Sequence, residues 1–503
     1  MTIDPGRRQI EYSRHIFGHF IEHFHRQVYG GLFDPGSPLS DERGFRRDVL
    51  AALRELNVPN VRWPGGCFVS AYHWVDGIGS SRRPTFDRAW RVSDPNTFGT
   101  DEFLAWCEEL GAAAYICTNA GTGTPEEMAD WVEYVNRPIG SRWADRRAEN
   151  GHPEPYGVPF WSIGNENYGD WELGAKSAEE WAAYVAESAK LILRTDPEVR
   201  LLAAAVERTD WALPLLEQAG KYLSYISIHG YWDGLWEIDE PSPYLACMAH
   251  TTEPERQISL ARAMIEASGQ HHVKIAFDEW NLRGWHHPTG SDPATIAARD
   301  RNDRNATYTM ADAVFSACFL NSCLRNADSV GMANLAPTVN ARGPLFVHEG
   351  GVVRRTTFHV MRMYADLLGP RVLDAQIRSA NLATGSGDVP LVDAVATGDD
   401  DGFVTISLVN KSDRDEAAVR VVIGGRPVTG EHDATVLTGT GPDAFNDVDA
   451  PEAVVPVTGR LSFTDGVVML PPHSVSICRV RGQHDEPPAL AWTVGRSGVV
   501  RAE

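Results

Sequence analysis

Short apolar segments alternate with amphipathic helical segments over roughly the first two thirds of the chain. Each apolar segment is flanked by turn residues or helix caps, as is typical of strands buried in a parallel sheet. Eight such strands alternating with helices predict a (β/α)8 barrel of the TIM type, with an open doubly wound sheet as the alternative topology. The predicted strands are Phe17–His23, Asn60–Gly65, Ala113–Asn119, Phe160–Glu166, Arg200–Val206, Tyr225–Tyr231, Val273–Trp280 and Ser329–Leu335.

Helix signals occupy several of the gaps between these strands. The segment Asp101–Gly111 places its apolar residues on one helical face and ends at a glycine, which commonly terminates a helix. Two further helix starts have a capping box, in which a threonine or serine is followed three residues later by a glutamate. These pairs are Thr124 with Glu127 and Ser177 with Glu180. The pattern supports a parallel sheet connected by helices.

The character of the chain changes after a predicted helix at Thr357–Leu368. Helical periodicity ends, and β-branched segments separated by Gly, Asp and Pro follow, which is typical of a β-sandwich. The opening stretch Gln9–Ser13 is predicted to add one strand to that sandwich. We therefore divide the chain into an N-terminal strand joining the sandwich (1–14), the barrel (15–368), a jelly-roll-like β-sandwich (369–483) and a flexible tail (484–503).

Composition narrows the class of protein further. Of 503 residues, 43% are apolar and 23% charged, as in ordinary globular proteins. Lys and Arg number 46 against 68 Asp and Glu, a net charge of −22 that argues against nucleic acid or an anionic membrane as partner. The sequence contains neither an apolar run of membrane-spanning length nor an N-terminal secretory pattern. The seven cysteines are scattered, which suits reduced thiols. We expect a cytoplasmic protein.

Two glutamates follow strongly apolar runs at predicted strand ends, Glu166 at the end of the fourth strand and Glu279 at the end of the seventh. Barrel enzymes place their catalytic groups at the carboxyl ends of strands. The fourth and seventh strands lie across the barrel from each other, so the two carboxyl groups can flank a substrate. Glycoside hydrolysis needs such a pair, one protonated to donate to the leaving oxygen and one ionised. The alternative for each glutamate is a structural salt bridge.

Further polar and aromatic motifs stand at the other strand ends. They are Phe17-Gly-His-Phe-Ile-Glu22, Arg62-Trp-Pro-Gly-Gly-Cys67, Asn119-Ala-Gly-Thr-Gly-Thr124, Trp161-Ser-Ile-Gly-Asn-Glu-Asn167, His229-Gly-Tyr231 and Phe277-Asp-Glu-Trp-Asn281. Together they resemble glycoside hydrolase family 51, whose typical members are α-L-arabinofuranosidases. The combination with Arg-Trp-Pro-Gly-Gly is the most specific part of the resemblance, which extends from about Ile16 to Asn340.

The resemblance implies a retaining, exo-acting hydrolase of small arabinose-containing oligosaccharides. Glu166 would be the general acid/base and Glu279 the nucleophile, with their carboxyl groups about 5 Å apart. Asn165 would hold the sugar hydroxyl next to the anomeric carbon, and Glu22 would bind hydroxyls deep in the pocket. Family members commonly form hexamers or other oligomers, so a homo-oligomer is expected by analogy.

The resemblance also assigns the residues around this pair. His229 would orient the acid/base and Tyr231 the nucleophile, while Arg62 would keep the nucleophile ionised, because a nearby cation lowers a carboxyl pKa. Cys67 would contact the sugar. One departure is Pro337, which stands where family members often have glutamine after the eighth strand. Since proline lacks a side-chain donor, one sugar contact is expected to be missing, which leaves the preferred sugar open.

Other classes of function have less support. His15, His19 and His23 share a face only in a helix, whereas their segment is predicted as a strand; with no HExxH or CxxC motif, we expect neither a metal nor a cofactor. A Ser-His-Asp hydrolase is disfavoured because no GxSxG motif occurs. Two alternatives stay open. One is a glycosidase of the same fold with another specificity (galactofuranosidase, β-xylosidase or endo-glucanase), and the other is a non-catalytic sugar-binding barrel.

Overall fold

The computed structural model describes residues 1–235, 240–284, 294 and 303–481. Eight parallel strands form a closed barrel within them, which confirms the (β/α)8 prediction and shows that the open doubly wound alternative is wrong. All eight predicted strands are present; β9 and β10 extend further at their carboxyl ends than predicted, and the other six are shorter than their predicted ranges. In their order around the barrel, the strands are β2 (Gly18–Phe20), β3 (Asn60–Trp63), β6 (Ala113–Thr118), β7 (Phe160–Ile163), β8 (Arg200–Ala204), β9 (Tyr225–Asp233), β10 (Lys274–Arg283) and β11 (Val330–Leu335).

The helices pack around the barrel because each presents an apolar face to it. The predicted caps are present: Thr124 Oγ1 accepts from the N–H of Glu127, Ser177 Oγ from that of Glu180, and Gly111 has a φ of 79° after the helix end. The α-helices are α1 (Arg47–Glu55), α2 (Thr100–Leu110), α3 (Pro125–Asn136), α4 (Arg142–Glu149), α5 (Ala178–Thr195), α6 (Thr209–Ala219), α7 (Tyr244–Met248), α8 (Glu253–Ser268), α10 (Met310–Arg325) and α11 (Thr356–Leu367).

The interior of the barrel is filled rather than hollow. A compact cluster of inward-pointing side chains forms a core separate from the one between strands and helices. This cluster fills the barrel from within, as in other barrels of this type, whose functional groups stand at the carboxyl ends of the strands. The cluster consists of Tyr115, Phe160, Leu202, Tyr225, Ala276 and Met332.

A large antiparallel sheet dominates the C-terminal region, as predicted for a β-rich domain. Nine strands form it, in the order β21-β20-β1-β14-β17-β18-β25-β22-β23, and the short pair β19–β24 packs on one face. The strands are β1 (Thr2–Glu11), β14 (Arg371–Gln376), β17 (Val392–Gly398), β18 (Phe403–Asn410), β19 (Ala417–Arg420), β20 (Val422–Ile423), β21 (Arg426–Pro427), β22 (Gly430–Leu437), β23 (Val457–Phe463), β24 (Val467–Leu470) and β25 (Ser474–Arg481).

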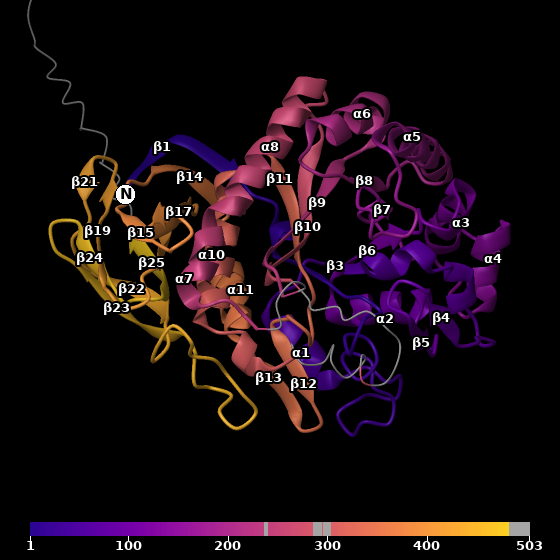
Figure 1. Cartoon of the computed structure of the whole chain (residues 1–503), viewed down its shortest axis with the longest axis horizontal. Coiled ribbons are helices and arrows are strands. Elements are labelled where there is room, and N and C mark those ends of the chain that lie inside the picture. Colours follow the sequence, from indigo (N-terminus) through magenta and orange to yellow (C-terminus); the bar gives the residue numbers. More distant parts are fainter. Residues whose placement is uncertain (236–239, 285–293, 295–302, 482–503) are drawn as a thin grey trace, which may run out of the picture.

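Residues of β18 alternate between two cores, as the two-residue period of a strand requires. Ile406 and Leu408 join β19 and β24, whereas Val409 joins the core shared with the barrel. Figure 1 shows α10 and α11 between this sheet and the barrel, and β1 beside β14. The first strand of the chain therefore completes a sheet made otherwise from its last third, pairing antiparallel with β14 and parallel with β20.

Besides the pair β19–β24, three short two-stranded sheets of the described residues lie outside the barrel and the large sheet. None of the described helices is long and apolar enough to cross a membrane. The tail predicted at 484–503 lies outside the described residues. The remaining strands pair in twos and are β4 (Thr85–Asp87), β5 (Val92–Asp94), β12 (Leu345–His348), β13 (Gly351–Arg354), β15 (Asn381–Ala383) and β16 (Asp388–Pro390).

Candidate active site

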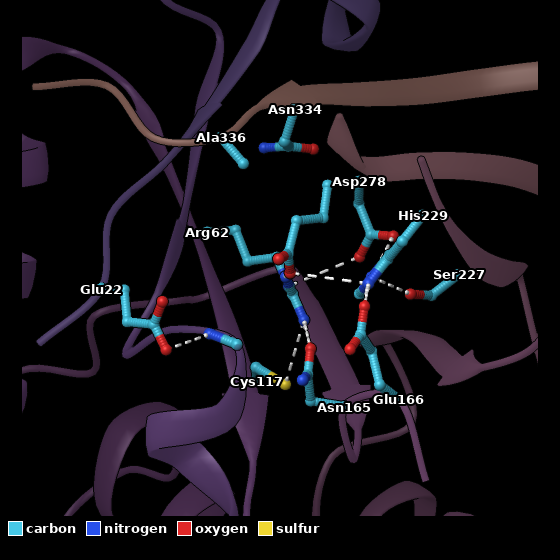
Figure 2. A network of polar contacts seen from close by, with 12 residues as sticks. Glu22, Arg62, Cys117, Asn165, Glu166, Ser227, His229, Asp278, Asn334 and Ala336 are labelled. Atoms are coloured by element: carbon cyan, nitrogen blue, oxygen red, sulfur yellow. Dashed lines mark hydrogen bonds and ion pairs between the residues drawn. The ribbon is translucent and has the colours of Figure 1, made fainter. Parts of the chain in front are cut away.

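The carboxyl end of the barrel brings the residues singled out by the motifs together, and most of them form one hydrogen-bonded network around Arg62. Figure 2 shows Arg62, Asn165, Glu166 and His229 of this network, with Glu22 beside it. They come from strands far apart in the sequence but adjacent or opposite in the barrel. Their order along the chain is Glu22 after β2, Arg62 in β3, Cys67 after β3, Asn165 and Glu166 after β7, His229 and Tyr231 in β9, and Glu279 in β10.

Arg62 lies at the centre of the network and is completely buried. One terminal nitrogen donates to Glu279 Oε2 at 2.7 Å, and the other donates to Asn165 Oδ1 at 2.7 Å. Its guanidinium carbon lies 5.1 Å from the centre of the Phe20 ring. A buried guanidinium with carboxylate and amide acceptors has a fixed orientation, so Arg62 sets the positions of both neighbours.

Glu279 is held at both carboxylate oxygens. Besides Arg62 at Oε2, the Tyr231 hydroxyl donates to Oε1 at 2.6 Å. The backbone of Gly66 approaches so closely that a Cβ there would lie 3.3 Å from Oε2. Gly65 has a φ of 149°, and a Cβ on it would lie 2.2 Å from Glu22 Cγ. The two glycines of the Arg-Trp-Pro-Gly-Gly motif are therefore needed to bring the chain against both carboxylates.

Glu166 faces Glu279 from a strained turn after β7. Its φ is 45°, a left-handed value uncommon for a non-glycine residue. The carboxylate has a contact at each oxygen: His229 Nδ1 lies 2.8 Å from Oε1, and Trp171 Nε1 donates to Oε2 at 2.9 Å. An oxygen of Glu166 lies within 4.8 Å of one of Glu279, in a group with a His229 nitrogen. A small molecule bound here would contact both carboxylates.

Protons are distributed unequally between Glu166 and His229. Burial alone would lower the pKa of His229, but the carboxylates of Glu279, Asp278 and Glu166 around it raise that pKa to about 10. Burial raises the pKa of Glu166, yet the hydrogen bond and charge of His229 outweigh it and lower the value. The pair therefore holds one proton at neutral pH, and in the free protein that proton is on His229.

Glu22 has a different environment from the other two carboxylates. Its Oε1 accepts from the N–H groups of Gly66 and Phe68, each at 3.1 Å, and from Trp90 Nε1 at 3.0 Å. Burial, reinforced by the charge of Glu279, raises the pKa of Glu22 to about 8 despite these donors. At neutral pH the side chain is mostly protonated, so it can both donate to and accept from a hydroxyl group.

Cys67 and Asn165 share a neighbour that the sequence did not single out, Glu172. Asn165 Nδ2 donates to Glu172 Oε2 at 3.3 Å, and Cys67 Sγ lies within 4.8 Å of carboxylate oxygens of Glu172 and Glu166. Burial raises the pKa of Glu172 to about 7 and that of the Cys67 thiol well above its usual range. The thiol therefore stays neutral, as a weakly polar contact rather than a nucleophile.

Metal-ligand geometry occurs twice in this site, in the groups Glu166–His229–Glu279 and Cys67–Glu166–Glu172. In the first, a metal would have to displace the proton that the surrounding carboxylates hold on His229, whose pKa they raise to about 10. In the second, the raised pKa of the thiol opposes thiolate binding.

The histidines weighed earlier are not in either group. His23 Nδ1 lies 2.9 Å from Asp94 Oδ2, its Nε2 accepts from Trp63 Nε1, and burial lowers the pKa of His19 to about 3.

Besides Trp90, which contacts Glu22, three more residues that the sequence did not single out belong to the site. Trp171 and Glu172 lie in the loop after Glu166, and Asp278 directly precedes Glu279. Asp278 is buried, accepts from the Tyr115 hydroxyl at 2.5 Å, and lies 3.6 Å from His229 Nε2. Asp278 could have been predicted from the sequence because it lies at the carboxyl end of a predicted strand. Trp171 and Glu172 could not, because their contacts depend on how the loop folds.

A pair of facing carboxylates at the carboxyl end of a (β/α)8 barrel is the arrangement that glycoside hydrolysis needs. Comparison with known proteins identifies the family. The model "Alpha-L-arabinofuranosidase 1 domain" matches residues 52–244, and "Alpha-L-arabinofuranosidase C-terminal domain" matches residues 278–474. The chain therefore belongs to the α-L-arabinofuranosidases of glycoside hydrolase family 51, which confirms the resemblance in the sequence and makes the protein a glycoside hydrolase.

Individual relatives agree with this assignment. Alpha-L-arabinofuranosidase C of Emericella nidulans is 33% identical, over 95% of this chain and 97% of that protein. An intracellular exo-alpha-(1->5)-L-arabinofuranosidase of Halalkalibacterium halodurans is 35% identical, over 82% of this chain and 84% of its own. The arabinose complex of the alpha-L-arabinofuranosidase from Thermotoga maritima superposes with a TM-score of 0.84 at 33% identity, covering 95% of this chain and 99% of that one.

Proposed function

We propose that this protein is a retaining, exo-acting α-L-arabinofuranosidase that releases terminal arabinofuranosyl residues from small oligosaccharides by double displacement. The observation that carries the proposal is the facing pair Glu166 and Glu279, whose nearest oxygens lie within 4.8 Å. Retaining enzymes keep their carboxyl groups about 5 Å apart, whereas inverting enzymes need more room for a water molecule.

In the first step, a Glu279 carboxylate oxygen attacks the anomeric carbon as the bond to the leaving oxygen breaks. Arg62 and Tyr231 hold that carboxylate through one hydrogen bond to each oxygen. The product of this step is a glycosyl ester of Glu279. Asn165 Oδ1 accepts from Arg62, and Nδ2 donates one hydrogen to Glu172, so its second hydrogen is the one that can bind the sugar hydroxyl next to the anomeric carbon.

The leaving oxygen takes its proton from the Glu166–His229 pair. His229 Nδ1 shares its proton with Glu166 Oε1 across 2.8 Å, and Glu166 passes a proton to the departing alcohol. In the second step, Glu166 removes a proton from a water molecule that attacks the anomeric carbon. The ester breaks and Glu279 is released as a carboxylate.

The substrate has a chemically distinct environment on each side of the cleaved bond. On the sugar side, Glu22 offers a carboxyl group to hydroxyls, and Cys67 a neutral thiol. On the leaving-group side, Trp171 donates to Glu166 Oε2 while 64% of the residue stays exposed, which leaves an aromatic face for the rest of the oligosaccharide.

The cellular compartment and the oligomeric state are also proposed, by similarity to relatives. A cytoplasmic location agrees with the printed name of the Halalkalibacterium halodurans relative, which is called intracellular. A homo-oligomer, hexameric by family analogy, is proposed on that analogy alone.

A second specificity has one observation in its favour. Pro337, buried directly after β11, offers no side-chain donor where family members often have glutamine. The enzyme should therefore be assayed for other activities beside that of an arabinofuranosidase, namely those of a galactofuranosidase, a β-xylosidase and an endo-glucanase.

The experiment is hydrolysis of four aryl glycosides by the wild type and by Glu279→Ala. The panel contains the α-L-arabinofuranoside, β-D-galactofuranoside, β-D-xyloside and β-D-glucoside. We expect the arabinofuranoside to be preferred, with turnover reduced on the order of 10⁴-fold or more in the variant. If another sugar were preferred, the proposed specificity would be wrong but the proposed mechanism would stand. If none of the four glycosides were hydrolysed, the non-catalytic sugar-binding barrel would be favoured.

A further inference from the structure

Arg342 is a half-buried arginine at the sugar end of the site that no motif singles out. Its guanidinium carbon lies 4.3 Å from the centre of the Tyr231 ring. Its charge acts on two carboxyl groups at once: it lowers the pKa of Glu22, and the charge of Glu279 helps to raise the pKa of Arg342 itself. A cation felt by both groups lies in the space that they border.

The backbone that carries Arg342 is strained and firmly held. Asn340 and Ala341, the two residues before it, have left-handed φ values of 55° and 44°. The Asn340 side chain accepts from the N–H of Val347 at 2.8 Å, and Arg355 donates to the carbonyl of Ala341 at 2.7 Å. Strain kept in place by several hydrogen bonds fixes where the Arg342 side chain starts.

Within the described part of the chain, the guanidinium of Arg342 has few hydrogen-bond acceptors. Its Nε donates to the carbonyl of Ala336 at 3.1 Å, and its guanidinium also interacts with the hydroxyl of Tyr231. Across the described residues, no carboxylate forms an ion pair with it. A guanidinium has five N–H donors, so terminal donors remain next to Pro337, the position that lacks one.

The two oxygens of Glu279 separate Arg342 from Asn165. Arg62 connects Oε2 to Asn165, and Tyr231 connects Oε1 to Arg342. In a furanose, the anomeric carbon is bonded to the carbon bearing the 2-hydroxyl on one side and to the ring oxygen on the other. If the 2-hydroxyl lies at Asn165, the ring oxygen and the carbon bearing the exocyclic group lie on the Arg342 side.

We propose that Arg342 determines specificity by donating a hydrogen bond to the exocyclic hydroxyl of the bound furanose, in place of a side-chain amide at position 337. This inference rests on the proposed function. The ring oxygen is excluded as the acceptor, because positive charge develops there in the oxocarbenium-like transition state and a guanidinium would oppose it.

A neutral sugar fits this cation better than an anionic one. Glu22 is mostly protonated at neutral pH, but Glu279 acts as a carboxylate in the proposed mechanism, so a carboxylate on the sugar would place a second negative charge in this space. A hydroxyl accepts from the guanidinium without that cost, in a bond strengthened by the charge of the donor.

The test removes the guanidinium from the enzyme and the exocyclic hydroxyl from the substrate, separately and together. The wild type, Arg342→Ala and a control, Arg479→Ala, are assayed on an aryl α-L-arabinofuranoside and on its 5-deoxy analogue. Arg479 is a good control because its guanidinium also packs on an aromatic ring, at 3.9 Å from Phe403, but lies in the C-terminal sheet. Melting temperatures establish that each variant is folded.

We expect Arg342→Ala to lower kcat/KM on the arabinofuranoside by roughly 10- to 100-fold, the range for a hydrogen bond to a charged group. On the 5-deoxy analogue the same variant should lose less than about 3-fold, and the control should lose nothing on either. Added guanidinium ion should restore part of the activity of Arg342→Ala on the arabinofuranoside alone.

Three results would overturn the inference. Equal losses on both substrates would mean that Arg342 acts through Tyr231 and Glu279 rather than on the exocyclic hydroxyl. A wild-type preference for the matching arabinofuranuronoside, abolished in Arg342→Ala, would assign the cation to an anionic sugar. Failure of the wild type on every arabinofuranoside would instead remove the proposed function on which the inference rests.

Discussion

The strand β10 contributes residues to two buried clusters of charged side chains. The clusters lie only a few residues apart, but they differ in how many of their donors and acceptors have hydrogen-bond partners. Arg283, at the end of the strand, donates to both oxygens of Asp312 at 3.0 Å each and to Asp233 at 2.6 Å. Asp278 and Glu279, earlier in the same strand, belong to the cluster around Arg62. Each cluster contains one more carboxylate than cationic side chains.

The Arg62 cluster leaves polar atoms without partners. Arg62 Nε and Asp278 Oδ1 have no hydrogen bond in the described part of the chain, and the closest ion-pair distance between these two residues is 3.5 Å. The carboxylate of Glu166 is 14% exposed, whereas Arg283 and its two partners are each at most 3% exposed. Since Arg62 and Asp278 are themselves fully buried, the atoms that the catalytic cluster offers to a substrate are those of the partly exposed Glu166 and Glu279.

The largest effect that separates the two clusters is expected from Glu166→Gln. Without a proton donor, kcat on a substrate with a poor leaving group should fall on the order of 10³-fold, and much less on an activated aryl glycoside, whose leaving oxygen needs little protonation. Comparison of kcat on both substrates measures this. The control is Glu217→Gln, exposed on α6; equal losses on both substrates would remove Glu166 from the acid role.

The matching change in the other cluster is Asp312→Asn. Because it leaves Arg283 buried with one of its two carboxylates, we expect the free energy of unfolding to fall by about 3 kcal/mol. Urea unfolding checks this, with Asp366→Asn, exposed on α11, as the control. Folded Asp312→Asn should keep the wild-type kcat and KM; a lost activity at unchanged stability would make this cluster functional.

An effect of similar size, but dependent on pH, is expected from Glu172→Gln. Burial raises the pKa of Glu172 to about 7 from about 4.5, so the folded wild type binds a proton that the unfolded chain releases between these values. Wild-type stability should therefore fall as pH rises from 4.5 to 7 by on the order of 3 kcal/mol from this group, at ~1.4 kcal/mol per pKa unit. Glu172→Gln lacks this fall, so its advantage in urea unfolding should grow up to pH 7 and then level off. A constant difference across pH would contradict the buried, proton-binding Glu172.

Periodicity predicted the barrel well because all eight strands are short apolar segments with clear limits, and their closure follows from their number. The carboxyl pair was also predictable, since a glutamate after a strongly apolar run is unusual. The second layer of the C-terminal region was less visible. The short pair β19–β24 forms one face of its core, and no pattern in the sequence says which strands leave the main sheet.

Residues in loops were the main omission. Trp171 and Trp90 donate to Glu166 and Glu22, yet each lies several positions from its motif and reads as an ordinary aromatic residue. The proton on His229 was not foreseen either. It results from three carboxylates meeting around one imidazole, which only the folded barrel brings together.

The most direct test of the account is to locate the covalent intermediate. Glu166→Gln, which forms the glycosyl ester from an activated aryl α-L-arabinofuranoside but removes it slowly, is quenched in acid during turnover, digested and analysed by peptide mass spectrometry. The account predicts a peptide heavier by one arabinosyl group, with the modification on Glu279. An adduct on another residue, or none while the enzyme turns over and releases the inverted anomer, would contradict it.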